Sequence, residues 1–235
     1  MAEGGHILAS ILKKVIAAAQ PGTRTVELDA LAADLCQRHR VQPAFLGYQG
    51  YPATLCTSLN HTIVHGIPGN ETLKRGDILG LDMGIKYKGF YTDMAVTIGI
   101  GNIGKNETKL IRATRDALNQ SIALIKPGVT LGDLGHLVAG IAAQHKLCVV
   151  QDLTGHGIGR QLQENPSIPN YGVQGQGLTL RAGMTLAIEP MFTVGKPNVK
   201  THSDGWSVVI ADNSPGAHFE HTVAVEKKGC RILTV

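Results

Sequence analysis

Two aspartates, Asp82 and Asp93, lie in residues 77–99, where a lysine-rich turn separates two strand-like patterns. If the hairpin centres between Tyr87 and Lys88, the two aspartates lie directly opposite each other, with Cβ atoms about 4.5–5.5 Å apart. Like charges so placed are destabilising unless a cation lies between them, and divalent cations prefer hard oxygen ligands. The pair therefore predicts a metal site. The alternative is that both aspartates face solvent.

The second half of the chain offers matching groups. Glu189 lies in GMTLAIEPMF and Glu220 in AHFEHTVAVE, both largely apolar segments in which an unpartnered glutamate is rarely buried. His156 lies in the glycine-rich segment LTGHGIGRQLQENP. One imidazole and four carboxylates form a suitable ligand set for two metal ions about 3.5–4 Å apart.

A weak internal repeat indicates how these groups are positioned. Two segments, 20–41 and 126–147, each carry Pro-Gly near their start and then the apolar spacing of an amphipathic helix. A further helix is expected before each segment, over 7–19 and 107–125. Strand-like runs follow at 78–83, 91–98, 184–188, 206–210 and 218–226. These patterns predict two similar α/β halves, roughly 1–104 and 105–235, which face each other across one sheet within a single domain. The alternative is that Pro-Gly is simply a common turn sequence between helices and that the two segments are not a repeat.

Bulk composition favours a soluble cytoplasmic protein. The 235 residues are 43% hydrophobic and carry a net charge of +4, with the basic residues scattered. Nucleic-acid binding is therefore not implied, although weak attraction to ribosomal surfaces is compatible with this charge. The N-terminus lacks a signal-peptide pattern and no apolar run reaches about 18 residues, which predicts a cytoplasmic protein. Four widely spaced cysteines predict reduced thiols: Cys36, Cys56, Cys148 and Cys230.

Several motifs carry a family resemblance. They are HGIP at 65–68, the aspartates of LDMG and TDMA, GHGIGR at 155–160, AIEP at 187–190 and FEHT at 219–222. In this order the motifs resemble the type I methionine aminopeptidases over nearly the whole chain. The resemblance implies an α+β, pita-bread fold, in which two pseudo-symmetric halves surround a central antiparallel sheet and a dimetal centre. It also implies removal of the initiator methionine from nascent proteins and peptides with a small second residue.

The resemblance assigns roles to the five ligand-type residues. Asp82 would chelate one ion alone, and His156 with Glu189 would bind the other. Asp93 and Glu220 would bridge the two ions. Glu189 would also take and return the proton of the attacking water. Carboxylate-rich sites accept Mn²⁺, Fe²⁺, Co²⁺ or Zn²⁺, so the sequence does not select one ion.

The remaining implied roles concern the substrate. His65 would contact the scissile amide. An apolar, aromatic-lined pocket would surround the methionine side chain, which suits an unbranched thioether: Phe45, Tyr48, Tyr51, Cys56 and Trp206. The expected partners are the N-termini of nascent polypeptides, with neither a specific nucleic acid nor a membrane, and the expected state is a monomer.

One position departs from the family pattern. Where the family has a second histidine soon after GHGIGR, to hydrogen-bond the substrate carbonyl, this chain has Gln163. Losing such a donor costs about 2.7–4 kcal/mol, part of which a glutamine amide should recover. The expectation is a slower but competent enzyme, unless a nearby group such as His218 compensates.

Three alternative functions remain open at this point. One is a related proline-specific peptidase of the same fold. The second is a weakly active or non-catalytic binding homologue, which the glutamine at position 163 motivates. The third is a protein that stores or senses metal.

Overall fold

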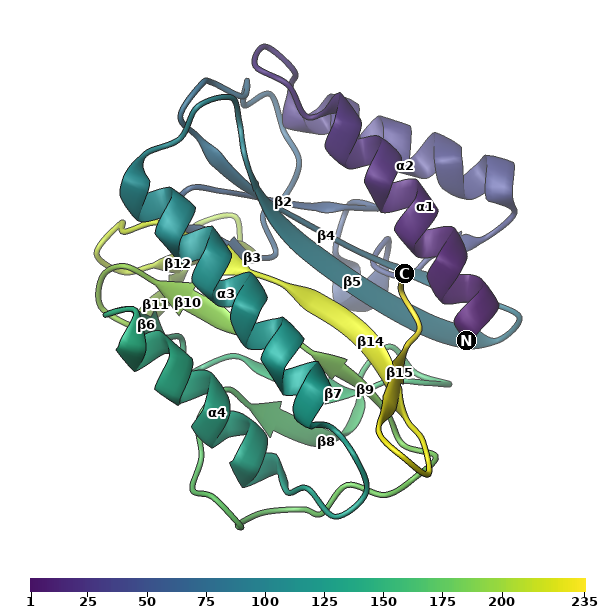
Figure 1. The fold of residues 1–235 in the computed structure, drawn as a ribbon. Helices are drawn as coiled ribbons and strands as arrows, with labels where there is room; N and C mark the ends of the chain where they lie inside the picture. The colour runs from purple at the N-terminus through teal and green to yellow at the C-terminus, as the bar shows by residue number, and fades with distance from the viewer.

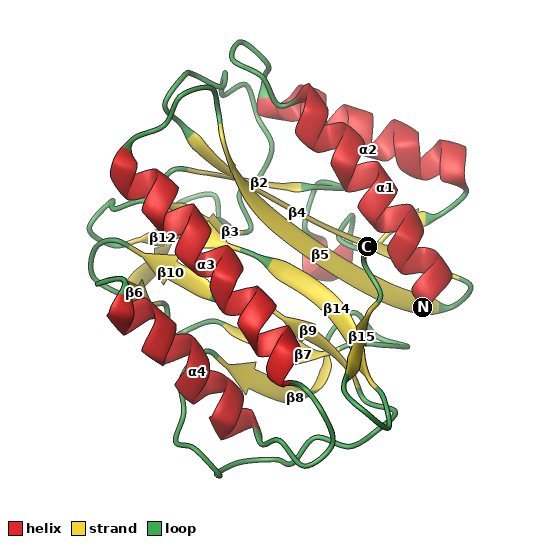
Figure 2. Ribbon diagram, in the orientation of Figure 1, coloured by secondary structure: helices red, strands yellow, loops and turns green.

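The computed structural model describes all residues from 1 to 235 and consists of helices packed on antiparallel sheets (Figures 1 and 2). The helices are α1 (Ala2–Ala18), α2 (Thr25–His39), α3 (Lys105–Leu124) and α4 (Leu131–Gln144), with a short 3-10 turn η1 (Tyr48–Gly50). The first eight strands are β1 (Gln42–Pro43), β2 (Cys56–Leu59), β3 (Thr62–Val64), β4 (Ile78–Tyr87), β5 (Phe90–Gly99), β6 (Cys148–Val149), β7 (Thr154–Gly157) and β8 (Glu164–Pro169). The others are β9 (Thr185–Ile188), β10 (Met191–Thr193), β11 (Val199–Thr201), β12 (Val208–Ile210), β13 (Gly216–His218), β14 (Glu220–Val225) and β15 (Cys230–Ile232).

A central sheet runs through the molecule in the order β1-β4-β5-β14-β9-β7-β8, with β2 beside β4 and β15 beside β14. All of its pairings are antiparallel, which confirms the expected sheet type. Helices α1 and α3 lie across the same face of this sheet, with α2 packed beside α1 and α4 beside α3 (Figure 1). Two three-stranded sheets, β13-β10-β6 and β11-β12-β3, complete the fold. No helix is both long and apolar enough to cross a membrane.

Helix α1 begins at Ala2, five residues before the start of the expected helix. Its apolar stripe starts only at Leu8, so hydrophobic periodicity gives no signal for the first turn. Gly4 and Gly5 occupy that turn, where Gly4 packs against the side chain of Tyr87 and Gly5 approaches the backbone near the end of the sequence. A Cβ on Gly5 would lie 1.9 Å from the carbonyl oxygen of Leu233.

The hairpin β4–β5 has a different register from the one expected. Its turn is the two-residue Lys88-Gly89, with φ of +49° and +83°, and positive φ at both positions is typical of the type I′ turn. Asp82 therefore pairs with Ala95, and Asp93 pairs with Gly84. The prediction that the aspartates lie directly opposite each other was wrong. They are diagonal neighbours on one face of the hairpin.

Side-chain alternation in β4 separates the core from the site. Leu79, Leu81, Met83 and Ile85 point to the helical face, where they pack with residues of α1 and α2. Because successive side chains of a strand point to opposite faces, Asp82 projects from the other face. The alternative that both aspartates face solvent was therefore wrong, because Asp82 is 8% exposed and Asp93 is 5% exposed.

The expected strand at 218–226 is two strands that belong to different sheets. His218 ends β13 and pairs with Met191 of β10, whereas Glu220 begins β14 and pairs with Ala95 of β5. The chain changes sheets at Phe219. Likewise, the expected strand at 206–210 begins only at Val208, which leaves its first two residues in the preceding turn.

Candidate active site

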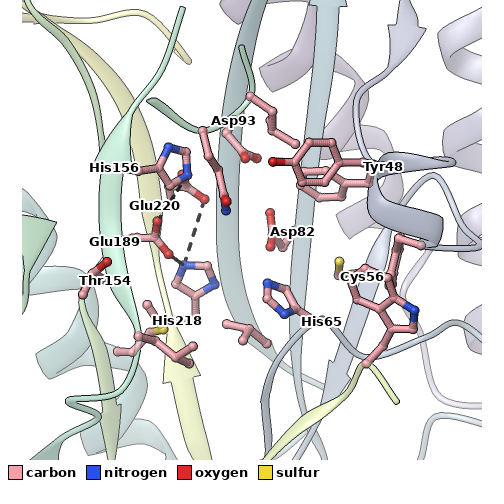
Figure 3. Close-up of a pocket in the computed structure, with 18 of the residues that line it drawn as sticks. Tyr48, Cys56, His65, Asp82, Asp93, Thr154, His156, Glu189, His218 and Glu220 are labelled. Carbon is pink, nitrogen blue, oxygen red and sulfur yellow. Dashed lines mark ion pairs between the residues drawn. The ribbon is translucent and has the colours of Figure 1, made fainter. Parts of the chain in front are cut away.

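A cavity of about 180 Å³ opens at the central sheet and is lined by every residue predicted to belong to the active site, several of which are labelled in Figure 3. The predicted residues that line it are Phe45, Tyr48, Tyr51, Cys56, His65, Asp82, Asp93, His156, Gln163, Glu189, Trp206 and Glu220. His218 lines it as well. No lysine or arginine is among the lining residues.

The five ligand-type side chains come from five neighbouring strands of the central sheet. In the order of the sheet, they are Asp82 on β4, Asp93 on β5, Glu220 on β14, Glu189 directly after β9 and His156 on β7. Each of these strands thus positions one ligand-type side chain at the same cavity. A sheet with its core on the helical face thus presents a row of polar groups on the other face.

In two groups of three residues that line the cavity, the possible ligand atoms lie within 4.8 Å of one another. One group is Asp93, His156 and Glu220, and the other is Glu189, His218 and Glu220. Glu220 belongs to both groups and is 2% exposed. Asp82 belongs to neither group, and burial together with the nearby Asp93 carboxylate raises the pKa of Asp82.

The buried carboxylates of the cavity favour the binding of a positive charge. Burial, reinforced by the Glu189 carboxylate, raises the pKa of Asp93 to about 7, and burial raises the pKa of Glu189 to about 7. Burial and the neighbouring carboxylates also raise the pKa values of Asp82 and Glu220 far above their ordinary range. Burial lowers the pKa of His218 to about 4, so this imidazole does not supply the charge.

Several buried polar atoms in the cavity have no hydrogen-bond partner. They include Asp82 Oδ1, Glu220 Oε1 and His218 Nε2. Buried polar groups are normally satisfied, and unpaired ones indicate a ligand site. Acidic oxygens and an imidazole nitrogen are also the donors that divalent transition ions accept. The residues present therefore fit a bound metal.

His156 is held with one ring nitrogen free. Its Nδ1 lies 2.8 Å from the carbonyl oxygen of Gly157. A carbonyl only accepts, so Nδ1 donates in this bond and Nε2 is the nitrogen left to bind a metal. That Nε2 faces Oε1 of Glu189 at 3.6 Å. Fixing the tautomer through the other nitrogen is the usual way in which a histidine is prepared for a metal.

One threonine joins the two halves of the sheet beside the site. The hydroxyl of Thr222, on β14, accepts a hydrogen bond from the backbone N–H of Asp93 (2.9 Å) and donates to the Asp93 carbonyl (2.8 Å). The Asp93 carboxylate also accepts from the backbone N–H of Met94 (3.0 Å). Asp93 is thereby fixed at the seam between β5 and β14.

The apolar wall of the cavity is built around Tyr51. Its ring stands edge-on to Phe45, with centroids 6.5 Å apart, and to Trp206, with centroids 5.2 Å apart. Its hydroxyl donates to the carbonyl of Gly66 at 3.0 Å. Cys56 lies in the same cluster and is buried, which raises the pKa of its thiol. The wall suits an unbranched apolar side chain.

His65 lies between the wall and the carboxylates. Its φ of +59° is rare for a residue with a side chain and costs about 1–3 kcal/mol, a kind of strain that is concentrated at functional sites. Gly66 follows it, where a Cβ would lie 2.2 Å from the carbonyl oxygen of Thr57. Burial lowers the pKa of His65 to about 4, so it is neutral at pH 7.

Gln163 and His218 differ in depth. Gln163 is exposed at the rim, in the bend between β7 and β8, whereas His218 is 3% exposed inside the cavity. Its place two residues before Glu220 was the only sequence signal for His218. That His218 reaches the same carboxylates as His156 was not foreseen.

Comparison with known proteins identifies the family. The model of metallopeptidase family M24 matches residues 1–227. Methionine aminopeptidase of Clostridium perfringens is 42% identical, with 100% of this chain and 94% of the relative covered. The chain therefore belongs to metallopeptidase family M24 and, within it, to the methionine aminopeptidases. Methionine aminopeptidase 1 of Bacillus subtilis is similarly related, at 40% identity over 100% of this chain and 94% of that protein.

Solved structures of the methionine aminopeptidases show the same fold. The enzyme of Thermotoga maritima superposes with a TM-score of 0.98 at 42% identity, covering 100% of this chain and 94% of the other. The prolidase of Pyrococcus horikoshii gives a TM-score of 0.78 at 21% identity and covers 100% of this chain and 60% of the other. At that identity the prolidase likeness shows the pita-bread fold alone. The predicted fold is thus confirmed.

Proposed function

We propose that this chain hydrolyses the first peptide bond of proteins and peptides that begin with methionine followed by a small residue. The observation that carries the proposal is the convergence of four carboxylates and a tautomer-fixed imidazole, with no lysine or arginine, on a cavity with an aromatic wall. The methionine aminopeptidase relatives at about 40% identity favour this activity over a proline-specific one. The expected surroundings are the cytoplasm, where the chain would act as a monomer on nascent N-termini.

Two divalent cations, of Mn²⁺, Fe²⁺, Co²⁺ or Zn²⁺, would be held by the five ligand-type residues. Asp82 would hold one ion alone, and His156 with Glu189 would hold the other. Asp93 and Glu220 would contact both. When bound, such ions lower the pKa of a water and polarise a carbonyl.

The protein's own residues would bind and orient the substrate and move the proton. The Glu189 carboxylate, at the edge of the ligand group, would accept a proton from the attacking water and return it to the leaving amine. His65 would donate a hydrogen bond to the scissile amide. The amide of Gln163, at the rim, would donate to the substrate carbonyl. The wall around Tyr51 would hold the methionine side chain and exclude water from it.

The test is steady-state release of methionine from Met-Ala-Ser. Protein stripped of metal would be reloaded separately with each candidate ion, beside an Asp93→Ala control. We expect metal-dependent release in the wild type and a loss of at least about 10³-fold in the control, because Asp93 would contact both ions. Met-Leu-Ser should react slowly.

The same assay separates the rival functions. Preferential cleavage of Ala-Pro substrates would favour a proline-specific peptidase. Metal binding without hydrolysis of either substrate, in folded protein, would contradict the proposal and leave a binding or metal-storing homologue.

A further inference from the structure

His218 is a buried imidazole whose inward nitrogen has no hydrogen-bond partner. Its Nε2 lies 3.4 Å from Oε2 of Glu189 and 4.0 Å from Oε2 of Glu220. Both separations exceed the usual 2.7–3.2 Å of an N–H···O hydrogen bond. The side chain is 4% exposed, so water does not replace the missing partner freely.

The shorter of these separations is that of adjacent ligands around a common ion. Nitrogen and oxygen ligands lie about 2.0–2.2 Å from a transition metal, which places adjacent ligand atoms about 3–3.5 Å apart. The distance from His218 to Glu189 falls in this range. It also resembles the 3.6 Å between His156 Nε2 and Glu189 Oε1. The two oxygens of Glu189 thus each face an imidazole (Figure 3).

The backbone of His218 is fixed by a buried residue of the central sheet. The hydroxyl of Thr97, on β5, accepts a hydrogen bond from the N–H of His218 (3.0 Å) and donates to its carbonyl (2.8 Å). Thr97 is 2% exposed. The imidazole is therefore held at the carboxylates by the same strand that carries Asp93.

We propose that His218 binds metal directly through Nε2, in a group with Glu189 and Glu220. This inference rests on the proposed function, because it requires a bound divalent ion. A second imidazole adds a softer donor to a set that is otherwise mostly carboxylate, and imidazole favours Co²⁺, Zn²⁺ and Fe²⁺ over Mn²⁺. The group should therefore move the preference of the site away from Mn²⁺.

The decisive experiment observes the ligands themselves. In the Co²⁺-loaded wild type, each coordinated imidazole gives one paramagnetically shifted, exchangeable N–H proton signal in the NMR spectrum. We expect one signal that His156→Gln abolishes and another that His218→Gln abolishes. By calorimetry, His218→Gln should weaken Co²⁺ binding at least about tenfold and Mn²⁺ binding by less.

His221→Gln is the matched control. His221 is also a partly buried histidine of this segment, but its Nδ1 contacts the hydroxyl of Thr234 rather than the cavity, so its replacement should leave both signals and the affinity unchanged. Thermal unfolding of each metal-free variant checks that the fold persists. A wild-type spectrum with the His156 signal alone would overturn the proposal and leave His218 as a donor to substrate. Wild-type protein that binds no metal would overturn the proposed function as well.

Discussion

At the scale of single residues, Gln163 is the clearest departure from the family pattern. It lies exposed at the rim of the cavity, and its amide can donate a hydrogen bond but carries no positive charge. His218, by contrast, lies too deep to take over at the rim and faces the carboxylates. The two residues therefore have different expected effects on catalysis.

Replacing Gln163 by histidine should raise the turnover number about tenfold, because an imidazole is the better donor to a developing oxyanion. Steady-state kinetics with Met-Ala-Ser at fixed metal loading measures the change. The double variant Gln163→His with His218→Gln keeps the donor but loses the proposed ligand, so weaker metal binding should persist in it. An unchanged turnover number in the single variant would show that this position does not limit the rate.

At the scale of elements, the turn before β12 positions part of the pocket. The carboxylate of Asp204 accepts hydrogen bonds from the backbone N–H of Trp206 (2.8 Å), the backbone N–H of Ser207 (2.8 Å) and the Ser207 hydroxyl (2.6 Å). These bonds close the turn from which Trp206 reaches Tyr51. Asp204 itself does not line the cavity.

Asp204→Ala should raise KM for methionine peptides about tenfold, the equivalent of about 1.4 kcal/mol, with little change in kcat or metal affinity. Trp206 is the single tryptophan of the chain, so its fluorescence should shift to longer wavelength as the turn loosens. Asp212→Ala is the matched control, because Asp212 accepts similar backbone hydrogen bonds in another loop, away from the cavity. Equal effects of both substitutions on KM would contradict the positioning role.

The elements also show what the sequence reveals and what it leaves hidden. Asp82 and Asp93 were recognisable because acidic residues interrupt apolar strands, although the turn was placed one residue too early and the register was therefore wrong. The first turn of α1 carried no apolar stripe, and its Gly5 allows a close contact with Leu233, far away in the sequence. The orientation of His218 depends on Thr97, more than a hundred residues away, and on a change of sheet at Phe219. Local patterns do not encode such contacts.

The division of the chain into two similar halves, at residues 104 and 105, stays a prediction.

At the scale of the whole molecule, the site stabilises the fold only when its charge is neutralised. The carboxylates with raised pKa values hold protons more tightly in the folded than in the unfolded chain: Asp82, Asp93, Glu189 and Glu220. Their contribution to stability is therefore present below about pH 4 and is lost as pH rises through about 7 and above. Burial lowers the pKa values of three histidines to about 4: His65, His218 and His221. Because these imidazoles bind protons more tightly in the unfolded chain, their contribution to stability is present above about pH 6.5 and is lost as pH falls through about 4.

Above about pH 6.5 the histidines are neutral in both states, and the carboxylates alone set the slope. The free energy of unfolding of metal-free protein should thus fall by a few kcal/mol between pH 6.5 and pH 8.5. Denaturant titration across this range measures it. Saturating Co²⁺ should flatten the dependence, because bound cations replace the protons. A metal-free protein whose stability rises over this interval would contradict the raised pKa values.

The strand order has a consequence for the timing of synthesis. β14 lies between β5 and β9, so the middle of the sheet is made of the last long strand of the chain. A nascent chain that has emerged only through β9 has neither His218 nor Glu220, and the edges of β5 and β9 are still open to other strands. The two parts of the sheet therefore join only after β14 has been synthesised. Until then, the exposed edges of β5 and β9 can pair with strands of other proteins unless another molecule covers them. The nascent chain also lacks a complete active site during this time.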